Sequence, residues 1–237
     1  MSSDPVITFD HVWKKYSKQQ VLNNSLREEL VSFVTGRKCN DELTAGEFWA
    51  LQDVAFSVNR GECVGLYGPN GSGKSTILKL ISNVTYPNRG TIAVRGRVAP
   101  LIELGAGMHP DLTGYENIYM NGTILGLSIR EIKVKMDEIV EFSGLSEFIQ
   151  VPVKKYSSGM FLRLAFSIAV HSPAEIFLFD EVLAVGDSAF MEKCEYKINA
   201  LLSENKTILL VSHEVDIMNK FASYRLNIVN GQCHRGE

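Results

Sequence analysis

The stretch Gly68-Pro69-Asn70-Gly71-Ser72-Gly73-Lys74-Ser75 decides the fold of this chain, because it fits the phosphate-binding pattern G-x-x-x-x-G-K-[ST]. An apolar run, Cys63–Tyr67, precedes it, and Thr76–Ile81 follows with a helical pattern. The order strand, glycine loop and helix is the context that the motif requires. Glycines let successive backbone N–H groups point at phosphate oxygens, and the helix N-terminus adds partial positive charge. The alternative, a glycine-rich turn with a surface lysine, is disfavoured by this context.

The loop predicts a nucleotide site that works with Mg²⁺. Lys74 is expected to reach the β- and γ-phosphates, and the hydroxyl of Ser75 is expected to take one position on the metal. The loop residues predicted to bind ATP are Gly68, Asn70, Gly71, Ser72, Gly73, Lys74, Ser75 and Thr76.

Composition places the chain among ordinary globular proteins. With 237 residues, of which 45% are hydrophobic, it is long enough for one large α/β domain or two small ones. The net charge of −3 argues against a broad nucleic-acid surface, so no nucleic-acid partner is expected. The polar start Met1–Pro5 does not resemble a signal peptide, and the apolar runs are too short to span a bilayer. If the protein works at a membrane, another chain is expected to supply the membrane part.

Strand-like and helical patterns alternate along the chain. The helical pattern runs from about Leu112 to Ser172, and Ser128–Glu131 within it forms a capping box. On one face of the helix that follows lie Ile132, Met136, Ile139 and Val140. Strands are predicted at Val6–Phe9 with the residues that follow, and at Leu51–Val58, Cys63–Tyr67, Thr91–Val94, Ile176–Phe179 and Thr207–Val211. The pattern indicates an α/β core with a helical insert.

Two polar strand ends are candidates for chemistry. Asp180 and Glu181 follow an apolar strand, where an aspartate can hold Mg²⁺ and a glutamate can act as general base toward water. Taken alone, such a pair is more often a helix cap, but the phosphate loop earlier in the chain reverses those odds. His213 ends another predicted strand; it is either a loop residue or a contact of the γ-phosphate.

The segment Tyr156-Ser157-Ser158-Gly159-Met160 lies between these motifs and resembles the Leu-Ser-Gly-Gly-Gln signature of the ATP-binding-cassette (ABC) ATPases. The resemblance covers essentially the whole chain. It implies an α/β P-loop NTPase fold: an ABC-type nucleotide-binding domain with a RecA-like core, an antiparallel β-subdomain and a helical subdomain. It further implies that Ser157, Ser158, Gly159 and Met160 cap the γ-phosphate of ATP held by the other subunit of a homodimer.

The same resemblance assigns further residues and a domain scheme. It implies that Asp187 is the D-loop aspartate, His213 the switch histidine and Tyr16 the aromatic that stacks on adenine, with Glu181, His213 and Lys74 as the catalytic residues. In this scheme 1–111 and 173–237 form the core with its β-subdomain, 112–172 the helical subdomain, and 19–49 an inserted segment.

The chain departs from the family at one place. ABC ATPases usually carry a glutamine at the junction of core and helical insert, whereas the junction Ala99–Pro110 contains none. Glu103 is the nearest polar candidate for that position. A carboxylate accepts hydrogen bonds or binds Mg²⁺ but cannot donate as an amide does, so metal coordination there is in doubt.

The details of the junction resemble the ATPases of bacterial polysaccharide exporters, notably Glu103–Gly107, His109–Gly114, Glu116–Tyr119 and Asp180–Asp187. The resemblance implies an ATPase that drives export of lipid-linked O antigen, capsule or teichoic acid. Its partners would be a second copy and an ABC-2 type permease, at the cytoplasmic face of the inner membrane. Because the printed chain ends at Glu237, we expect no carbohydrate-binding domain. The alternatives are another transporter ATPase (an importer or a drug exporter), a non-transport ABC ATPase, and a scaffold that binds ATP without turnover.

The inserted segment 19–49 predicts a short amphipathic helix. Ser25–Glu28 is a capping box, and Gly36 is a natural stop. The apolar stripe consists of Leu26, Leu30, Phe33 and Val34. Such a stripe packs either on its own domain or, as the resemblance implies, at the membrane face beside the permease.

Overall fold

Two short apolar strands, β6 (Ile176–Asp180) and β7 (Thr207–Val211), form the inner part of a parallel sheet. Every residue of β7 is buried, and so are the first four residues of β6. Strands that are apolar on both faces are typical of parallel sheets with helices on either side, and both were predicted as strands from their apolar runs.

The structure is a computed structural model, and it describes residues 4–17, 43–44, 46–101, 105, 107–180, 187–212 and 215–236. Its contacts divide the chain into two compact units. The first consists of Met1–Val58, Tyr67–Arg95 and Leu226–Glu237, and the second of Asn59–Leu66 and Gly96–Arg225. Each unit is described separately, and the domain scheme inferred from the sequence stays a prediction.

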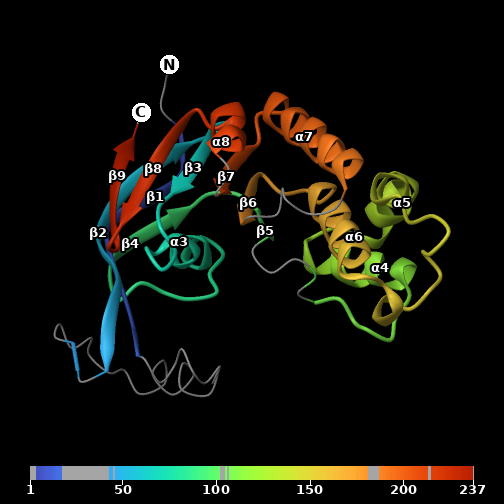
Figure 1. Ribbon diagram of the computed structural model, residues 1–237, viewed down its shortest axis with the longest axis horizontal. Coiled ribbons are helices and arrows are strands. Elements are labelled where there is room, and N and C mark those ends of the chain that lie inside the picture. Colours follow the sequence, from blue (N-terminus) through green and yellow to red (C-terminus); the bar gives the residue numbers. More distant parts are fainter. Residues whose placement is uncertain are drawn as a thin grey trace. The chain divides into compact units, whose positions relative to one another are not determined.

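The second unit contains the parallel strands. β5 (Val98–Leu101) pairs with β6, β6 with β7, and β7 with β3 (Cys63–Tyr67) (Figure 1). The full sheet order is β5-β6-β7-β3-β8-β9. Since all four strands point the same way, their carboxyl ends lie along one edge of the sheet.

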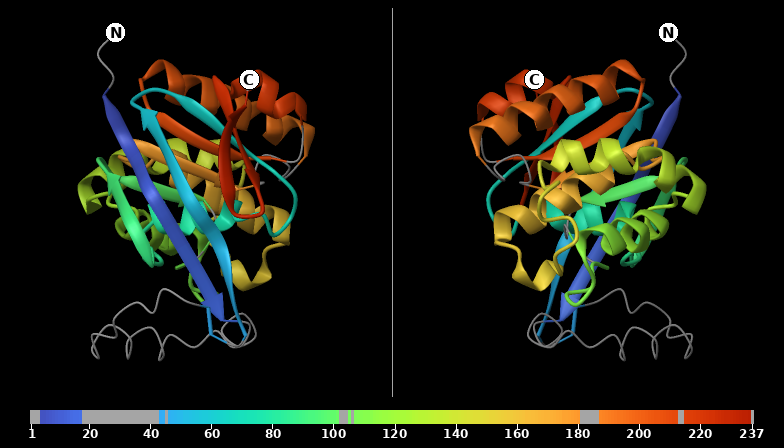
Figure 2. Two further views of the ribbon diagram at one scale, coloured as in Figure 1. Left: turned by 90° about the vertical axis from the view of Figure 1, so that its left-hand side faces the viewer. Right: turned by 90° about the vertical axis from the view of Figure 1, so that its right-hand side faces the viewer.

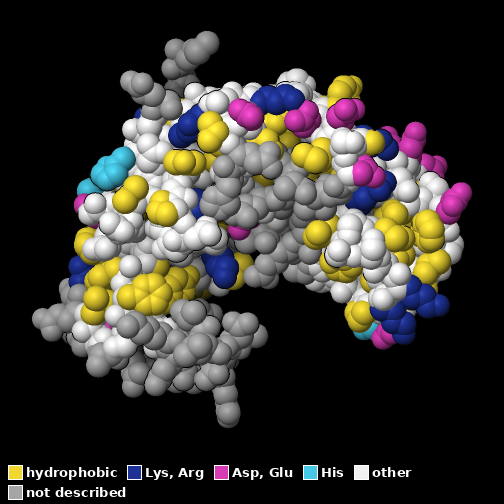
Figure 3. Space-filling model, in the orientation of Figure 1, with side chains coloured by type: hydrophobic (Ala, Val, Ile, Leu, Met, Phe, Trp, Pro, Cys, Tyr) yellow, Lys and Arg dark blue, Asp and Glu magenta, His cyan; other side chains and the backbone are white. Residues whose placement is uncertain are grey.

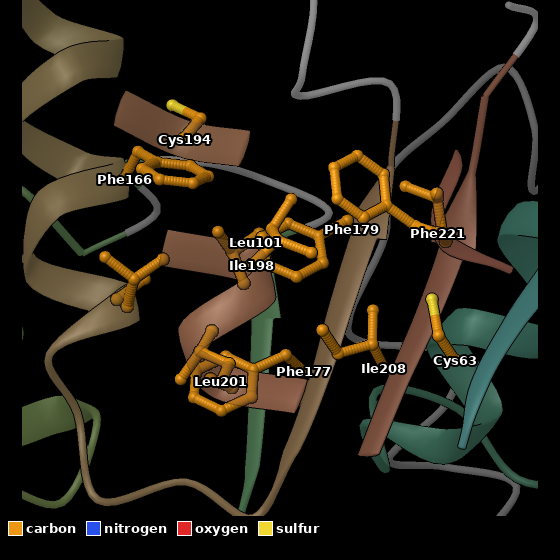
Figure 4. Packing of buried hydrophobic residues seen from close by; sticks show 14 of the residues in the cluster. Cys63, Leu101, Phe166, Phe177, Phe179, Cys194, Ile198, Leu201, Ile208 and Phe221 are labelled. Atoms are coloured by element: carbon orange, nitrogen blue, oxygen red, sulfur yellow. The ribbon is translucent and has the colours of Figure 1, made fainter. Parts of the chain in front are cut away.

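Helices α6 (Ser158–Val170), α7 (Ser188–Ser203) and α8 (Val215–Phe221) supply the rest of the core of this unit. Phe177 and Phe179 on β6 stack with their ring centroids 6.3 Å apart. Figure 4 shows these rings among Phe166 of α6 and Cys194 of α7. The core therefore ties the helix that begins in the signature-like segment directly to the central strands.

The helical part of the second unit consists of α4 (Gly114–Ile124), α5 (Ile129–Ser143), the short 3-10 helix η1 (Val153–Lys155) and α6. The predicted capping box at Ser128 and Glu131 is confirmed, since the serine accepts from the Glu131 N–H and the Glu131 carboxylate accepts from Ser128 N–H. Of the predicted stripe on α5, Ile132, Met136 and Ile139 are buried, whereas Val140 is half-buried.

The first unit carries an antiparallel sheet in the order β2-β1-β4, formed by β1 (Pro5–Ser17), β2 (Glu47–Asn59) and β4 (Arg89–Val94). β1 and β4 run antiparallel, and the long strands β1 and β2 lie side by side (Figure 2). The same unit contains α3 (Lys74–Ile81), most of β8 (Tyr224–Val229) and β9 (Gln232–Gly236). β2 is longer than the predicted strand Leu51–Val58.

Several predictions concern residues outside the described part of the chain. These are the amphipathic helix of 19–49, Glu103, Glu181 and His213. Among the described residues, no helix has both the length and the apolar character needed to cross a membrane.

Candidate active site

The phosphate loop connects β3 to α3, as predicted, and two of its glycines lie too close to neighbouring strands to carry a side chain. A Cβ at Gly68 would collide with the carbonyl oxygen of Ile228 on β8. A Cβ at Gly73, whose φ is 116°, would lie 2.7 Å from Leu51 Cδ2 and 2.8 Å from the oxygen of Ala50, both on β2. The loop backbone is therefore held against strands of its own unit.

Lys74 begins α3 and is only 7% exposed. Its ammonium donates to the carbonyl oxygens of Gly68, at 2.7 Å, and Pro69, at 3.0 Å. Within the described part of the chain it forms no ion pair. A buried cation held by neutral carbonyls alone can gain much by meeting an anion, because burial weakens the screening of its charge.

The loop also holds an unpaired hydroxyl. Ser72 is buried, and among the described residues its Oγ has no hydrogen-bond partner, although its carbonyl accepts from the N–H of Gly231 at 3.1 Å. A buried polar atom without a partner is costly unless a ligand satisfies it. The next serine, Ser75, is exposed on the first turn of α3. These observations fit an oxygen-rich ligand such as a polyphosphate with its cation.

The register of the parallel strands places Asp180 of β6 and Leu66 of β3 at the same edge of the second unit. Asp180 pairs with Val211 of β7, and Leu66 of β3 pairs with the same Val211 from the other side. Two strand spacings, about 10 Å, separate such positions. Asp180, the predicted metal aspartate, therefore lies at the carboxyl edge of the parallel strands of the second unit. Ser75 and Asp180 offer the hard oxygen ligands that Mg²⁺ prefers.

The signature-like residues form the start of α6. Ser157 is the N-cap, and its Oγ accepts from the N–H of Met160 at 3.2 Å. Ser157 and Ser158 are exposed, and a Cβ at Gly159 would meet no atom nearer than Ser157 Oγ at 3.9 Å. The first turn carries no acidic residue. This helix end can therefore accept an anion from outside its own unit.

Asp187 has a defined structural role at the start of α7. Its Oδ1 accepts from the N–H of Phe190 at 2.9 Å and so caps the helix. Its Oδ2 lies 3.6 Å from the guanidinium of Arg163 on α6. The sequence assigned Asp187 by resemblance alone and gave no reason to expect this pairing.

Tyr16, the predicted adenine-stacking residue, lies near the end of β1 and is half-buried. Its ring centroid is 6.3 Å from that of Phe48 on β2, and the ammonium of Lys14 lies 5.0 Å from its centre. Its role toward a nucleotide stays a prediction.

A hollow of about 630 Å³ lies elsewhere, between α5 and α7. Three carboxylates line it, and acidic side chains gather over these two helices on the face shown in Figure 3. Its lining residues are Glu138, Glu141, Phe142, His171, Ala189, Glu192, Lys193 and Tyr196. None of them belongs to the predicted nucleotide site, and an acidic lining is unsuited to a triphosphate.

Two structural roles in the junction were not predicted. Asn117 is fully buried, and its amide group donates to the carbonyls of His109, Leu112 and Thr113, which fixes the turn before α4. A Cβ at Gly105 would collide with the ring of Phe161 on α6. Asn117, in the predicted stretch Glu116–Tyr119, therefore has a structural role. Gly105 leaves room for the ring of Phe161, the residue that follows the signature-like segment.

Comparison with known proteins identifies the family. Residues 51–184, more than half of the chain, match the family described as ABC transporter. The chain belongs to this family. Its fold is also that of solved ABC cassettes: a dimeric ATP-binding cassette in a post-hydrolysis state with ADP and Pi has a TM-score of 0.76 at 21% identity, over 98% of this chain and 97% of that one.

Curated relatives of this ABC protein narrow the group. The O-antigen export system ATP-binding protein RfbB of Klebsiella pneumoniae is 42% identical over 226 residues, 95% of this chain and 91% of the relative. The teichoic acids export ATP-binding protein TagH of Bacillus anthracis is 40% identical over 95% of this chain. The chain spans only 39% of that relative, and 53% of an RfbB from Myxococcus xanthus. The predicted family, fold class and transporter-type ATPase are confirmed.

Proposed function

We propose that this ABC transporter protein is the ATP-hydrolysing subunit of an exporter for a lipid-linked polysaccharide of the O-antigen, capsule or teichoic-acid type. The observation that carries the proposal is the buried Lys74 ammonium, which among the described residues donates to the carbonyls of Gly68 and Pro69, in a loop where Gly68 and Gly73 have no room for a side chain. The names of relatives about 40% identical over most of the chain support the exporter class.

ATP would bind with its phosphates in the loop. Lys74 would leave the carbonyls of Gly68 and Pro69 and turn to the β- and γ-phosphate oxygens. The hydroxyl of Ser72 would find the partner that it lacks among the described residues. Tyr16 would stack on the adenine.

Hydrolysis would require an acid–base pair at the carboxyl edge of the sheet. Glu181, directly after β6, would accept a proton from the attacking water, and His213, two residues after β7, would donate to the γ-phosphate. Ser75 and Asp180 would hold Mg²⁺, which supplies neutralisation of phosphate charge when bound. The water would attack the γ-phosphorus in line with the bond to the departing ADP, and the products would be ADP and phosphate.

A second copy of the chain would complete each site. The start of α6, Ser157–Met160, in which Ser157 and Ser158 are exposed, would present N–H groups to the γ-phosphate held by the other copy. Closure of two copies over two ATP molecules would be transmitted to an ABC-2 type permease, at the cytoplasmic face of the inner membrane.

The test is deletion and complementation in the host of this chain. Without the chain, lipid-linked polymer should accumulate inside the cell, and the wild-type chain should restore surface polymer. Lys74→Ala should fail to restore it, whereas Lys79→Ala, on the same helix but in its last turn, should succeed. Normal surface polymer in the deletion strain would contradict the exporter assignment. Restoration by Lys74→Ala would contradict a role for ATP at this loop.

A further inference from the structure

The guanidinium of Arg163 lies where three helices of the second unit meet. Its Nε donates to the carbonyl of Ser143, the last residue of α5, at 2.9 Å. Its Nη1 lies 3.6 Å from Oδ2 of Asp187, the N-cap of α7. Its central carbon lies 5.1 Å from the ring centre of Phe190, in the first turn of α7. One side chain on α6 therefore contacts the end of α5 and the start of α7.

The residues around Arg163 leave space for its planar guanidinium group and face its N–H donors. Gly144, the left-handed C-cap of α5, would place a Cβ on the guanidinium nitrogen Nη2, so glycine leaves the space that the side chain fills. Asp187 divides its carboxylate, with Oδ1 capping α7 and Oδ2 facing the arginine. Only a side chain with several donors in fixed directions can serve both Ser143 and Asp187.

Arg163 is also rigidly linked to the signature-like segment. It lies five residues after Ser158 and two after Phe161 on the same helix, and a Cβ at Gly105 in the junction would collide with the Phe161 ring. A helix transmits displacement of its first turn to the second with little loss. A shift of the exposed end of α6 therefore moves the guanidinium that contacts Asp187.

We propose that Arg163 is a positioning residue that couples the exposed start of α6 to Asp187 and the beginning of α7. The proposal rests on the proposed function, in that the ligand at the exposed end is the γ-phosphate of ATP held by a second copy. Contact with that phosphate would draw α6 toward it and, through Arg163, shift Asp187 and the first turn of α7. Asp187 is the predicted D-loop aspartate, so Arg163 would act on turnover through Asp187 without touching the nucleotide.

The contact suits such a role better than a purely stabilising one. Asp187 is 64% exposed in its side chain, and the charges are 3.6 Å apart, so solvent weakens their attraction. A weak ion pair can form and break as α6 moves. A residue that served stability alone would be expected to be buried with its partner.

The test compares purified variants of the full chain, assayed as isolated protein and with its permease. Arg163→Gln removes the charge, Arg163→Lys keeps the charge without the fork, and Asp187→Asn keeps an N-cap oxygen without the charge. The control is Lys154→Gln, which breaks the exposed Lys154–Asp111 ion pair of 2.7 Å in the same unit. Readouts are the melting temperature, ATP affinity of the single chain, kcat, KM and ATP-driven association.

We expect Arg163→Gln and Asp187→Asn to leave ATP affinity within about twofold and to lower kcat by about tenfold to a hundredfold. The double variant should be no slower than the slower single variant, because both remove one link. Arg163→Lys should recover only part of the loss, and Lys154→Gln should match the wild type.

Unchanged kcat in Arg163→Gln would overturn the proposal, as would complete rescue by lysine or additive losses in the double variant. A parallel fall of melting temperature, affinity and kcat would show a merely structural residue. If the wild-type chain with its permease did not turn over ATP, the proposed function itself would be overturned. The wild-type assay alone shows this outcome, so it is distinct from failure of the Arg163 proposal.

Discussion

The starts of α3 and α6 are both expected to face phosphate, but they are built in opposite ways. At α3 the N-cap is Gly73, no side chain caps the helix, and Lys74 is buried. At α6 the N-cap is Ser157, whose hydroxyl accepts from the Met160 N–H, and the first residues are exposed. The start of α3 is packed against strands of its own unit, whereas the start of α6 is capped by its own serine and exposed to solvent.

The difference is sharpest at the two glycines. Gly73 has a positive φ, and Leu51 and Ala50 fill the space where its Cβ would lie. Gly159 has no such φ, and the space around it is open. A glycine that its own fold does not require, at an exposed helix start, is explained by close approach of another molecule. Under the proposed function, the enclosed end would bind phosphate by itself, and the open end would supply one half of a site shared with a second copy.

The largest effect is expected from Gly73→Ala. The new methyl group would clash with Leu51 and Ala50 in a backbone conformation that alanine avoids. We expect a loss of stability of about 1–3 kcal/mol and loss of detectable ATP binding. Thermal unfolding and equilibrium nucleotide binding check this. Full ATP affinity in Gly73→Ala would show that the loop is not held as described.

Glu181→Gln should leave both helix ends intact and slow only the chemistry. An amide cannot accept the proton of the attacking water, so turnover should fall by about 10²–10⁴. ATP should still bind, and the protein should accumulate as an ATP-bound dimer visible by light scattering. Near-normal turnover in purified Glu181→Gln would remove this residue from the role of general base.

Gly159→Ala is the matched partner of Gly73→Ala and should act in the opposite direction on stability. Alanine favours helix over glycine, so the melting temperature should stay level or rise, by about half a kcal/mol of unfolding free energy. ATP binding to the single chain should be unchanged. Turnover should fall by about tenfold, because the methyl group would stand where a second copy's phosphate must approach. Equal destabilisation by both alanines would remove the contrast between the two helix ends.

The smallest effect at neutral pH concerns the buried end of α6. Burial lowers the pKa of His171 from its ordinary 6.5 to about 4, against a hydrogen bond from Nδ1 to the Ser167 carbonyl of 2.6 Å. Because the pKa of His171 is lower in the folded state, its contribution to the free energy of unfolding is fully present above pH 6.5. This contribution is lost as the pH falls toward 4. The loss should reach about 3 kcal/mol at most.

His171→Gln should flatten this dependence between pH 6.5 and 4 in urea unfolding. Substitution of the exposed His109 by glutamine is the control and should keep the wild-type profile. An unchanged acid profile in His171→Gln would show that other groups govern stability in that range.

Much of this molecule could be predicted from its sequence, because the decisive residues are local. The phosphate loop, the strands β6 and β7 and the capping box of α5 each depend on neighbours in the chain. The pairing of Arg163 with Asp187 and the fit of Gly105 against Phe161 could not be predicted, because they join residues far apart in sequence. The predicted start of β2 is four residues too late, at Leu51 and not Glu47, because the apolar alternation that predicted the strand begins only at Leu51.

The central claim is that each ATP site is shared between two copies, and a mixture of two inactive variants tests it most directly. Lys74→Ala disables the enclosed half, and Ser157→Arg places a bulky cation on the open half. In a shared site each variant alone is inactive, but a mixed dimer regains one intact site, so the mixture should recover about a quarter of wild-type ATPase activity. If both halves belonged to one copy, every mixed dimer would stay inactive, and a mixture without activity would contradict the account.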